Sequence, residues 1–146
     1  MHIGRTIMRL TALALLGLVA AAPAQAATVK VIVEVTELNK GVVNIALCDR
    51  DLSKEGCTFF QSAPPTQKLL EFVFENVPAG RWAAVGFQDM DGDDEFDRLL
   101  GVPREPYALS GKAADILVPT FLDAALPIKD GTDNVIRIKM QRLIGK

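Results

Sequence analysis

The stretch from Asp89 to Asp97 concentrates the residues of this chain that are able to do chemistry. It reads DMDGDDEFD and places six carboxylates in nine positions. Five of them alternate along the chain with Gly92 among them, a spacing that suits a tightly turning loop around a cation. Calcium takes about six to eight oxygen ligands at about 2.3–2.6 Å, and carboxylates supply many of them. The predicted ligands are Asp89, Asp91, Asp93, Glu95 and Asp97.

The turn matches an EF-hand loop only in part. Counted from Asp89, glycine stands at position 4 instead of 6, and position 12 is Leu100 instead of glutamate. No pair of predicted helices flanks the turn. We therefore expect a looser, loop-type calcium site, with calcium as the one cofactor that the sequence suggests. A solvated acidic turn capped by its own side chains stays open as the alternative.

Carboxylates also act as acid and base in the hydrolysis of glycans, where a pair about 5–9.5 Å apart flanks a cleft. Glu105 and Asp123 are the possible partners outside the turn. The single histidine, His2, lies in a segment that we expect to be removed, which excludes histidine triads and histidine zinc sites from the processed chain. We expect no enzymatic activity, and a carboxylate-dependent glycan hydrolase remains the alternative.

A proline-rich loop, GVPREPY, follows the acidic turn at residues 101–107. Its two X-Pro bonds favour extended geometry in the residue before each proline. We expect a rigid loop packed across one end of the fold, in which the charged pair neutralises or extends the acidic turn. A rim that faces a ligand is the alternative. The residues of interest are Gly101, Pro103, Arg104, Glu105, Pro106 and Tyr107.

The first residues carry the pattern of a secretory signal peptide. Arg5 and Arg9 precede an apolar run, residues 10–22, and Ala24-Gln25-Ala26 resembles a cleavage site. The run is shorter than the roughly 20 residues of a membrane-spanning helix, so we expect no transmembrane anchor in the mature chain. The prediction is a cleaved signal peptide over residues 1–26 and export to the periplasm or the extracellular medium.

Removal of that segment leaves residues 27–146, a length typical of one domain. This part contains 14 basic and 18 acidic residues, a formal charge of −4. Such a balance argues against nucleic acid as a partner. An unknown protein or glycan of the cell envelope is the expected partner. Cys48 and Cys57, separated by eight residues in an exported chain, are expected to form a disulfide, and two separate buried thiols are the alternative.

Alternation of apolar and polar residues dominates the mature chain and predicts strands. Asn39-Lys40-Gly41 separates the first two strands and predicts a β-hairpin. Residues 49–66 are expected to form a long connection, and residues 109–126 have no clear pattern. The fold class is therefore all-β, an antiparallel β-sandwich of about seven strands, with a small closed barrel as the alternative. The predicted strands are residues 28–37, 41–48, 68–77, 81–89 and 134–143.

Several motifs together resemble the exported bacterial family called domain of unknown function (DUF) 2141. They include Val77-Pro78-Ala79-Gly80-Arg81-Trp82-Ala83, the acidic turn, the loop at residues 101–107 and Pro119-Thr120-Phe121. The family turn resembles D-x-N-G-N-G-x-x-D, and here Asp94 replaces its second glycine. The resemblance implies an exported β-sandwich of transthyretin-like or carboxypeptidase-regulatory-like character, and it implies no reaction. A purely structural accessory domain is thus another alternative.

Overall fold

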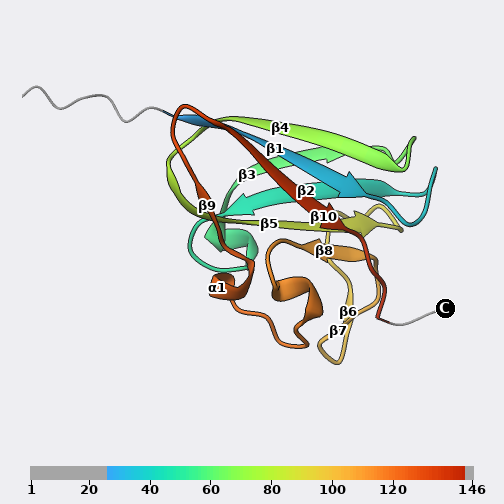
Figure 1. Ribbon diagram of the computed structural model, residues 1–146. Helices are drawn as coiled ribbons and strands as arrows, with labels where there is room; N and C mark the ends of the chain where they lie inside the picture. The colour runs from blue at the N-terminus through green and yellow to red at the C-terminus, as the bar shows by residue number, and fades with distance from the viewer. Residues whose placement is uncertain (1–25, 144–146) are drawn as a thin grey trace, which may run out of the picture.

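The computed structural model describes residues 26–143, and most of its strands lie in two sheets packed face to face (Figure 1). The predicted signal peptide lies outside the described residues except for Ala26. The first sheet consists of β10 (Asp133–Lys139), β1 (Ala27–Glu34) and β4 (Leu69–Val77), in that order. In this sheet β1 is central, antiparallel to β4 and parallel to β10.

The second sheet is antiparallel throughout. Its order is β3 (Cys57–Ala63), β2 (Val42–Cys48), β5 (Gly80–Asp89) and β8 (Tyr107–Leu109), and β9 (Leu126–Ile128) pairs with the beginning of β5. A separate small hairpin joins β6 (Arg98–Leu99) to β7 (Val102–Pro103) after the acidic turn.

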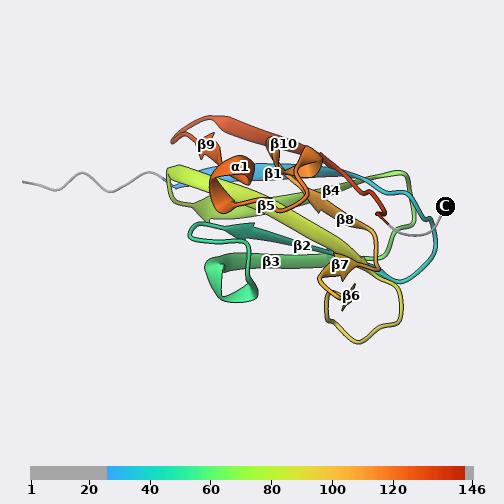
Figure 2. The ribbon, with the colours of Figure 1, turned by 90° about the horizontal axis from the view of Figure 1, so that it is seen from below.

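The core lies between the two sheets, which Figure 2 shows as two layers. Every second side chain of β1 and β2 points into it, and all of these are almost completely buried. The opposite positions of β1 are only partly buried. The period of two in the sequence is therefore the pattern of a strand with one wet face, as predicted. The core residues of these strands are Val29, Val31, Val33, Val43, Ile45 and Leu47.

The prediction of an all-β sandwich is confirmed, and the strands of residues 26–143 form separate sheets instead of one closed barrel. Two details differ. Residues 26–143 contain ten strands instead of about seven, and four of them have only two or three residues. The pairing of β1 with β10 is parallel, whereas the sequence predicted antiparallel pairs.

The predicted hairpin of the first two strands is wrong. β1 pairs with β4 and β10, and β2 pairs with β3 and β5, so the chain crosses from one sheet to the other at residues 35–41. The turn signal was real, because Asn39 and Gly41 have φ values of 58° and 61°. The predicted long connection, residues 49–66, contains β3. Burial alternates along β3, but residue type does not, because the exposed Phe60 follows the core-facing Phe59 directly.

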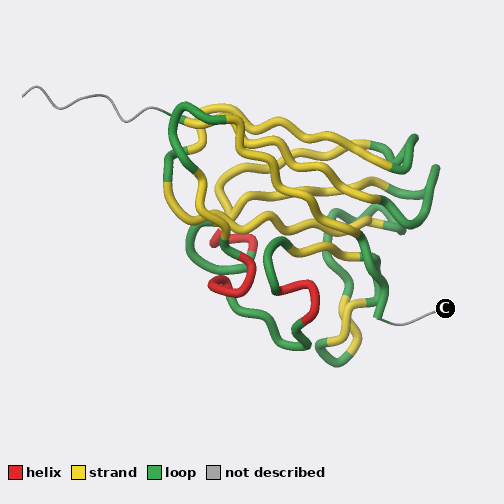
Figure 3. The backbone as a smooth tube through the Cα atoms, viewed as in Figure 1, coloured by secondary structure: helices red, strands yellow, loops and turns green. Residues whose placement is uncertain are grey.

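Three short helical segments gather on one side of the molecule, shown in red in Figure 3. They are η1 (Lys54–Gly56), η2 (Ala113–Asp115) and α1 (Phe121–Ala124), and the last two fill part of the region without a clear sequence pattern. Ala113 and Ala124 pack with Ala83 of β5 on the outer face of the second sheet. Within the described residues, no helix has the length and apolar character needed to cross a membrane.

Candidate functional site

The acidic turn begins inside the fold, because its first carboxylate belongs to the last residue of β5. Asp89 is only 1% exposed. Its Oδ1 accepts a hydrogen bond from the backbone N–H of Gly92 at 2.7 Å, and its Oδ2 accepts one from Asp94 at 3.0 Å. A carboxylate that accepts hydrogen bonds from the residues after it stabilises a tight turn. Asp89 therefore fixes the shape of the turn.

Three of the five predicted metal ligands come together at this turn. Asp89, Asp91 and Asp93 each place one carboxylate oxygen within 4.8 Å of the other two. Oxygens on opposite sides of a calcium ion at about 2.3–2.6 Å have a similar separation. The side chains of Asp91 and Asp93 are exposed, so a cation has access from solvent. These three carboxylates are suited to hold one divalent cation.

The other two predicted ligands do not join that group within residues 26–143. Glu95 is exposed and borders a groove on the outer face of the second sheet. Asp97 is half-buried and borders a cleft at the end of the sandwich, together with Asp91. Alternation along the sequence did not predict this separation, because the chain turns within the acidic stretch.

The electrostatics of the turn differ between its buried and exposed carboxylates. Burial raises the pKa of Asp89, but the backbone hydrogen bonds from Asp94 and Gly92 outweigh it, and the pKa is lowered overall. For Asp91, desolvation and the neighbouring charges of Asp93 and Asp97 raise the pKa. A charged Asp91 is thus disfavoured in the absence of a counter-ion, and a bound cation would remove this repulsion.

The backbone of the turn retains a conformation suited to glycine at both family glycine positions. Gly92 has a φ of 82°, and Asp94, where the family has its second glycine, has a φ of 61°. Aspartate adopts this left-handed conformation with some strain, whereas glycine adopts it freely. The substitution therefore adds a negative charge without removing the left-handed conformation.

Glu105 has a structural role that the sequence did not predict. It is 4% exposed, its Oε1 accepts the N–H of Met90 at 2.7 Å, and its Oε2 accepts the N–H of Asp97 at 3.3 Å. The side chain thus joins the two ends of the acidic turn. Desolvation raises its pKa, although these hydrogen bonds and the nearby aspartates act on it as well. The one sequence signal for a fixed Glu105 side chain was the pair of nearby prolines, Pro103 and Pro106, which restrict the backbone of this segment.

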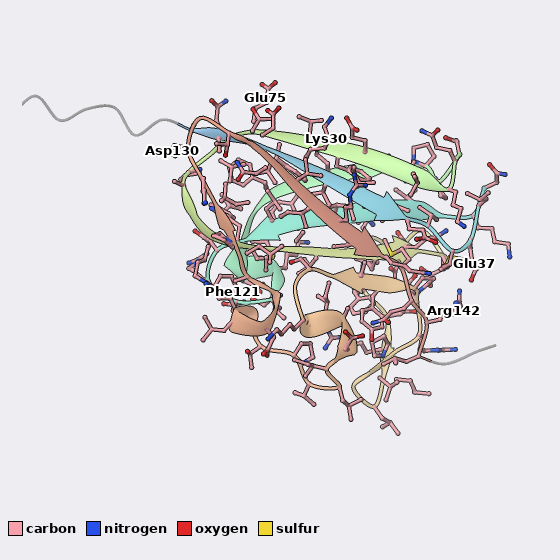
Figure 4. All side chains as sticks on the ribbon, viewed as in Figure 1. Lys30, Glu37, Glu75, Phe121, Asp130 and Arg142 are labelled. Atoms are coloured by element: carbon pink, nitrogen blue, oxygen red, sulfur yellow. A yellow bond between two sulfur atoms is a disulfide. The ribbon has the colours of Figure 1, made fainter. Side chains whose placement is uncertain are left out.

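Another contact missed in the sequence holds the crossing between the sheets against the end of β5. Gln88 is fully buried, and its Nε2 donates hydrogen bonds to the backbone oxygens of Glu37 at 2.7 Å and Lys40 at 2.6 Å. The Glu37 carboxylate pairs with Arg142 at 2.5 Å, and Figure 4 shows both side chains at the same end of the molecule. The end of the sandwich that carries the acidic turn is therefore held together by hydrogen bonds and an ion pair between distant segments of the chain.

The proline-rich loop lies beside the turn. Gly101 is in the turn between β6 and β7, with a φ of 82°, and Pro103 is the last residue of β7. Arg104 is exposed, and its N–H donates to the backbone oxygen of Asp97 at 3.0 Å. Pro106 is buried, and its oxygen accepts the N–H of Gln88 at 2.8 Å. Tyr107 is the first residue of β8, whereas the sequence predicted it at the end of the loop.

Two cavities adjoin the acidic turn. The smaller, of about 510 Å³, lies at the end of the sandwich and is lined mainly by charged residues, including Asp91, Asp97, Arg104 and Glu105. The larger, of about 930 Å³, is an open groove over the outer face of the second sheet. Its lining is mainly apolar, and Phe96 of the turn contributes to it. The groove residues include Phe60, Ala46, Val85, Phe87, Phe96, Tyr107 and Leu109.

Phe96 links the acidic turn to the groove. Its ring lies 5.4 Å from that of Phe87 and 6.1 Å from that of Tyr107, measured between centroids. The guanidinium of Arg98 lies over the same ring, 4.9 Å from its centroid. The first half of the turn therefore carries the three convergent carboxylates, and Phe96 near its end belongs to an aromatic cluster that lines the groove.

The disulfide and the possible catalytic partner are elsewhere. Cys48 and Cys57 form a disulfide, which joins the end of β2 to the start of β3 across the loop that contains η1. Asp123 caps α1, because its carboxylate accepts hydrogen bonds from the backbone N–H and the hydroxyl of Thr120. It lines neither of the two cavities, in contrast to Glu105.

Comparison with known proteins identifies the family. The model of the family described as "Uncharacterized protein conserved in bacteria (DUF2141)" matches residues 31–136, which include the acidic turn and the proline-rich loop. No curated protein and no solved structure gave a significant match. The match covers most of the chain and agrees with the motifs noted in the sequence. The chain belongs to the DUF2141 family.

Proposed function

We propose that this protein is an exported, non-enzymatic β-sandwich domain that is stabilised by calcium at the acidic turn and binds a partner of the envelope or the extracellular medium. The observation that carries the proposal is the convergence of Asp89, Asp91 and Asp93, with one oxygen of each within 4.8 Å of the others. The backbone hydrogen bonds to Asp89 support it further, since they hold the turn in one shape before an ion binds.

The outer groove supports a binding role. Its volume of about 930 Å³ lies within the usual range of ligand sites, and its apolar floor lies on rigid strands. The Cys48–Cys57 disulfide at one end suits an exported protein, since such bonds persist in oxidising compartments.

Thermal unfolding with calcium and with a chelator tests the proposal. A ligand present at 100 times its dissociation constant stabilises the native state by about 2.7 kcal/mol. We expect an unfolding midpoint several degrees higher in calcium than in chelator, and a smaller shift with magnesium, which keeps more of its water. The same midpoint under all three conditions, with no heat of calcium binding in calorimetry, would contradict the proposal.

A carboxylate-dependent glycan hydrolase is the second candidate, and one observation favours it. Glu105 has a raised pKa and borders the charged cleft together with Asp91 and Asp97. Both oxygens of Glu105 already accept backbone hydrogen bonds, which favours the structural role. The hydrolase would be supported by glycan turnover that Glu105→Gln abolishes while the folded structure persists, and we expect no turnover from the unmodified protein.

A further inference from the structure

β3 is an unusually unprotected edge strand. It pairs with β2 on one side only, and within the described residues no other strand pairs with its second side, as Figure 2 shows at the margin of the molecule. Its seven residues, CTFFQSA, include no charge and no proline. Natural proteins usually protect such an edge with charges, proline or a covering segment. β4, at the edge of the other sheet, has Glu71 and Glu75.

The central outward side chain of β3, Phe60, connects this edge to the apolar groove. Phe60 is 55% exposed, lines the groove, and lies opposite Ala46 of β2. The register continues this row to Val85 of β5 and Leu109 of β8. A strand added beside β3 would therefore find backbone partners along its edge and the apolar ring of Phe60 at the centre of the outer face.

Charges of opposite sign border the two ends of the groove. β2 and β5 are antiparallel, so the loop after β2 and the turn after β5 leave the sheet at opposite ends. Lys54 lines the groove from the first of these. Asp94, Glu95 and Arg98 line it from the second, so the two carboxylates outnumber the one cation there. None of these four side chains takes part in an ion pair among residues 26–143. An extended ligand would meet a positive charge at one end and a net negative charge at the other.

We propose that β3 is a docking edge for an extended peptide segment of a partner protein, with apolar side chains on one face and a basic residue at the end beside Asp94 and Glu95. The unpaired edge supplies main-chain hydrogen bonds, the groove selects the apolar side chains, and the charges fix the direction of the segment. This inference rests on the proposed binding function and specifies the chemistry of the partner.

The test is selection of a random seven-residue peptide library, matched to the length of β3, on protein expressed from the full-length coding sequence. Enriched peptides should alternate apolar and polar residues and have lysine or arginine at one end. Phe60→Lys should weaken their binding about tenfold or more, because it places a charge on the edge and removes the central apolar contact. Fluorescence anisotropy with labelled peptides measures the affinities.

Val135→Lys is the matched control, since it changes a 49% exposed apolar residue on β10, the edge of the other sheet that is farther from β3. It should leave peptide affinity within about twofold of the unmodified protein, as expected for a surface residue outside a binding site. Thr58→Lys, also exposed on β3, replaces Phe60→Lys if the latter does not fold. Removal of the charges of Asp94 and Glu95 by Asn and Gln should weaken basic peptides severalfold at low salt.

Three outcomes would overturn the docking edge. The first is that the selection enriches no peptide. The second is that enriched peptides bind the β3 variants as tightly as they bind the unmodified protein. The third is a dimer in sedimentation that Phe60→Lys dissociates, which would make a second copy of the chain the occupant. Calcium-dependent unfolding is independent of all three. A calcium shift without peptide binding would therefore reject the docking edge alone, and the reverse result would reject the calcium proposal alone.

Discussion

Asp89 and Glu105 show how two buried carboxylates can be structural in different ways. Both use each carboxylate oxygen for a backbone N–H, but Asp89 closes the beginning of the acidic turn and Glu105 joins its ends. Hydrogen bonds lower the pKa of Asp89, whereas desolvation raises that of Glu105. At the residue scale, the turn depends on its buried acids for shape and presents its exposed acids to solvent.

Asp89→Asn should destabilise the protein by about 1–3 kcal/mol at neutral pH, because the amide group would face the backbone N–H of Gly92 or Asp94 and lose that charge-assisted hydrogen bond. A lowered pKa means that the stabilisation by Asp89 is complete above 3.8 and is lost as the pH falls through the folded-state pKa. The difference between the two proteins should therefore shrink in acid. Chemical denaturation over a pH series measures it, and a difference that grows below pH 3.8 would contradict this account.

Asp94→Gly should stabilise the protein by about 0.5–1 kcal/mol in the absence of calcium, because the residue has a φ of 61°. Asp94→Ala removes the same charge but lacks the conformational freedom of glycine, so it separates the two effects. We expect the order glycine, aspartate, alanine in denaturant midpoints. If alanine is as stable as glycine, charge and not backbone strain explains the gain.

At the scale of the elements, the close pairing of β2 and β5 positions both the groove and the turn. Gly86 of β5 lies against Ile45 of β2, and a Cβ added there would collide with the Cδ1 of Ile45 and lie 3.0 Å from the backbone oxygen of Asn44. The small residues Ala83, Ala84 and Gly86 of this strand thus have a packing reason. They allow the sandwich core on one side and the short helices on the other to approach β5 closely.

Gly86→Ala should destabilise the protein by about 1–3 kcal/mol through overpacking. Ile45→Val removes the colliding methyl group, so the double variant should recover part of the loss, and the two changes should not be additive. Urea denaturation of the two single variants and the double variant measures this coupling. Additive losses would show that Ile45 does not restrict position 86.

The sequence predicts elements well where one face is buried, and less well where pairing is decided by distant residues. The alternating valines of β1 identify a strand, but they contain nothing that distinguishes β2 from β10 as its neighbour. β3 was not predicted as a strand because its outward face is not uniformly polar, since Phe60 lies between Thr58 and Ser62 on it. The convergence of Asp89, Asp91 and Asp93 follows from local spacing, whereas the role of Glu105 depends on a contact across 15 residues of chain.

For the whole molecule, the features on which the proposals rest gather at one end and on one face. The acidic turn lies at the same end as Glu37 and Arg142. Figure 4 shows Glu37 and Arg142 at this end and Asp130 at the opposite end. The groove starts at the acidic turn and extends over the second sheet to the unprotected edge of β3. A cation at the turn would thus stabilise the end of the sandwich from which the groove extends.

The most direct test of this account is thermal unfolding of the unmodified protein, Asp91→Asn and the distant control Asp130→Asn, each with calcium and with a chelator. Since neighbouring carboxylates contribute to the raised pKa of Asp91, its neutralisation should not lower the midpoint in chelator. In calcium, the unmodified protein and Asp130→Asn should gain several degrees, and Asp91→Asn should gain much less and become the least stable. Equal midpoints with and without calcium for all three proteins would contradict the account.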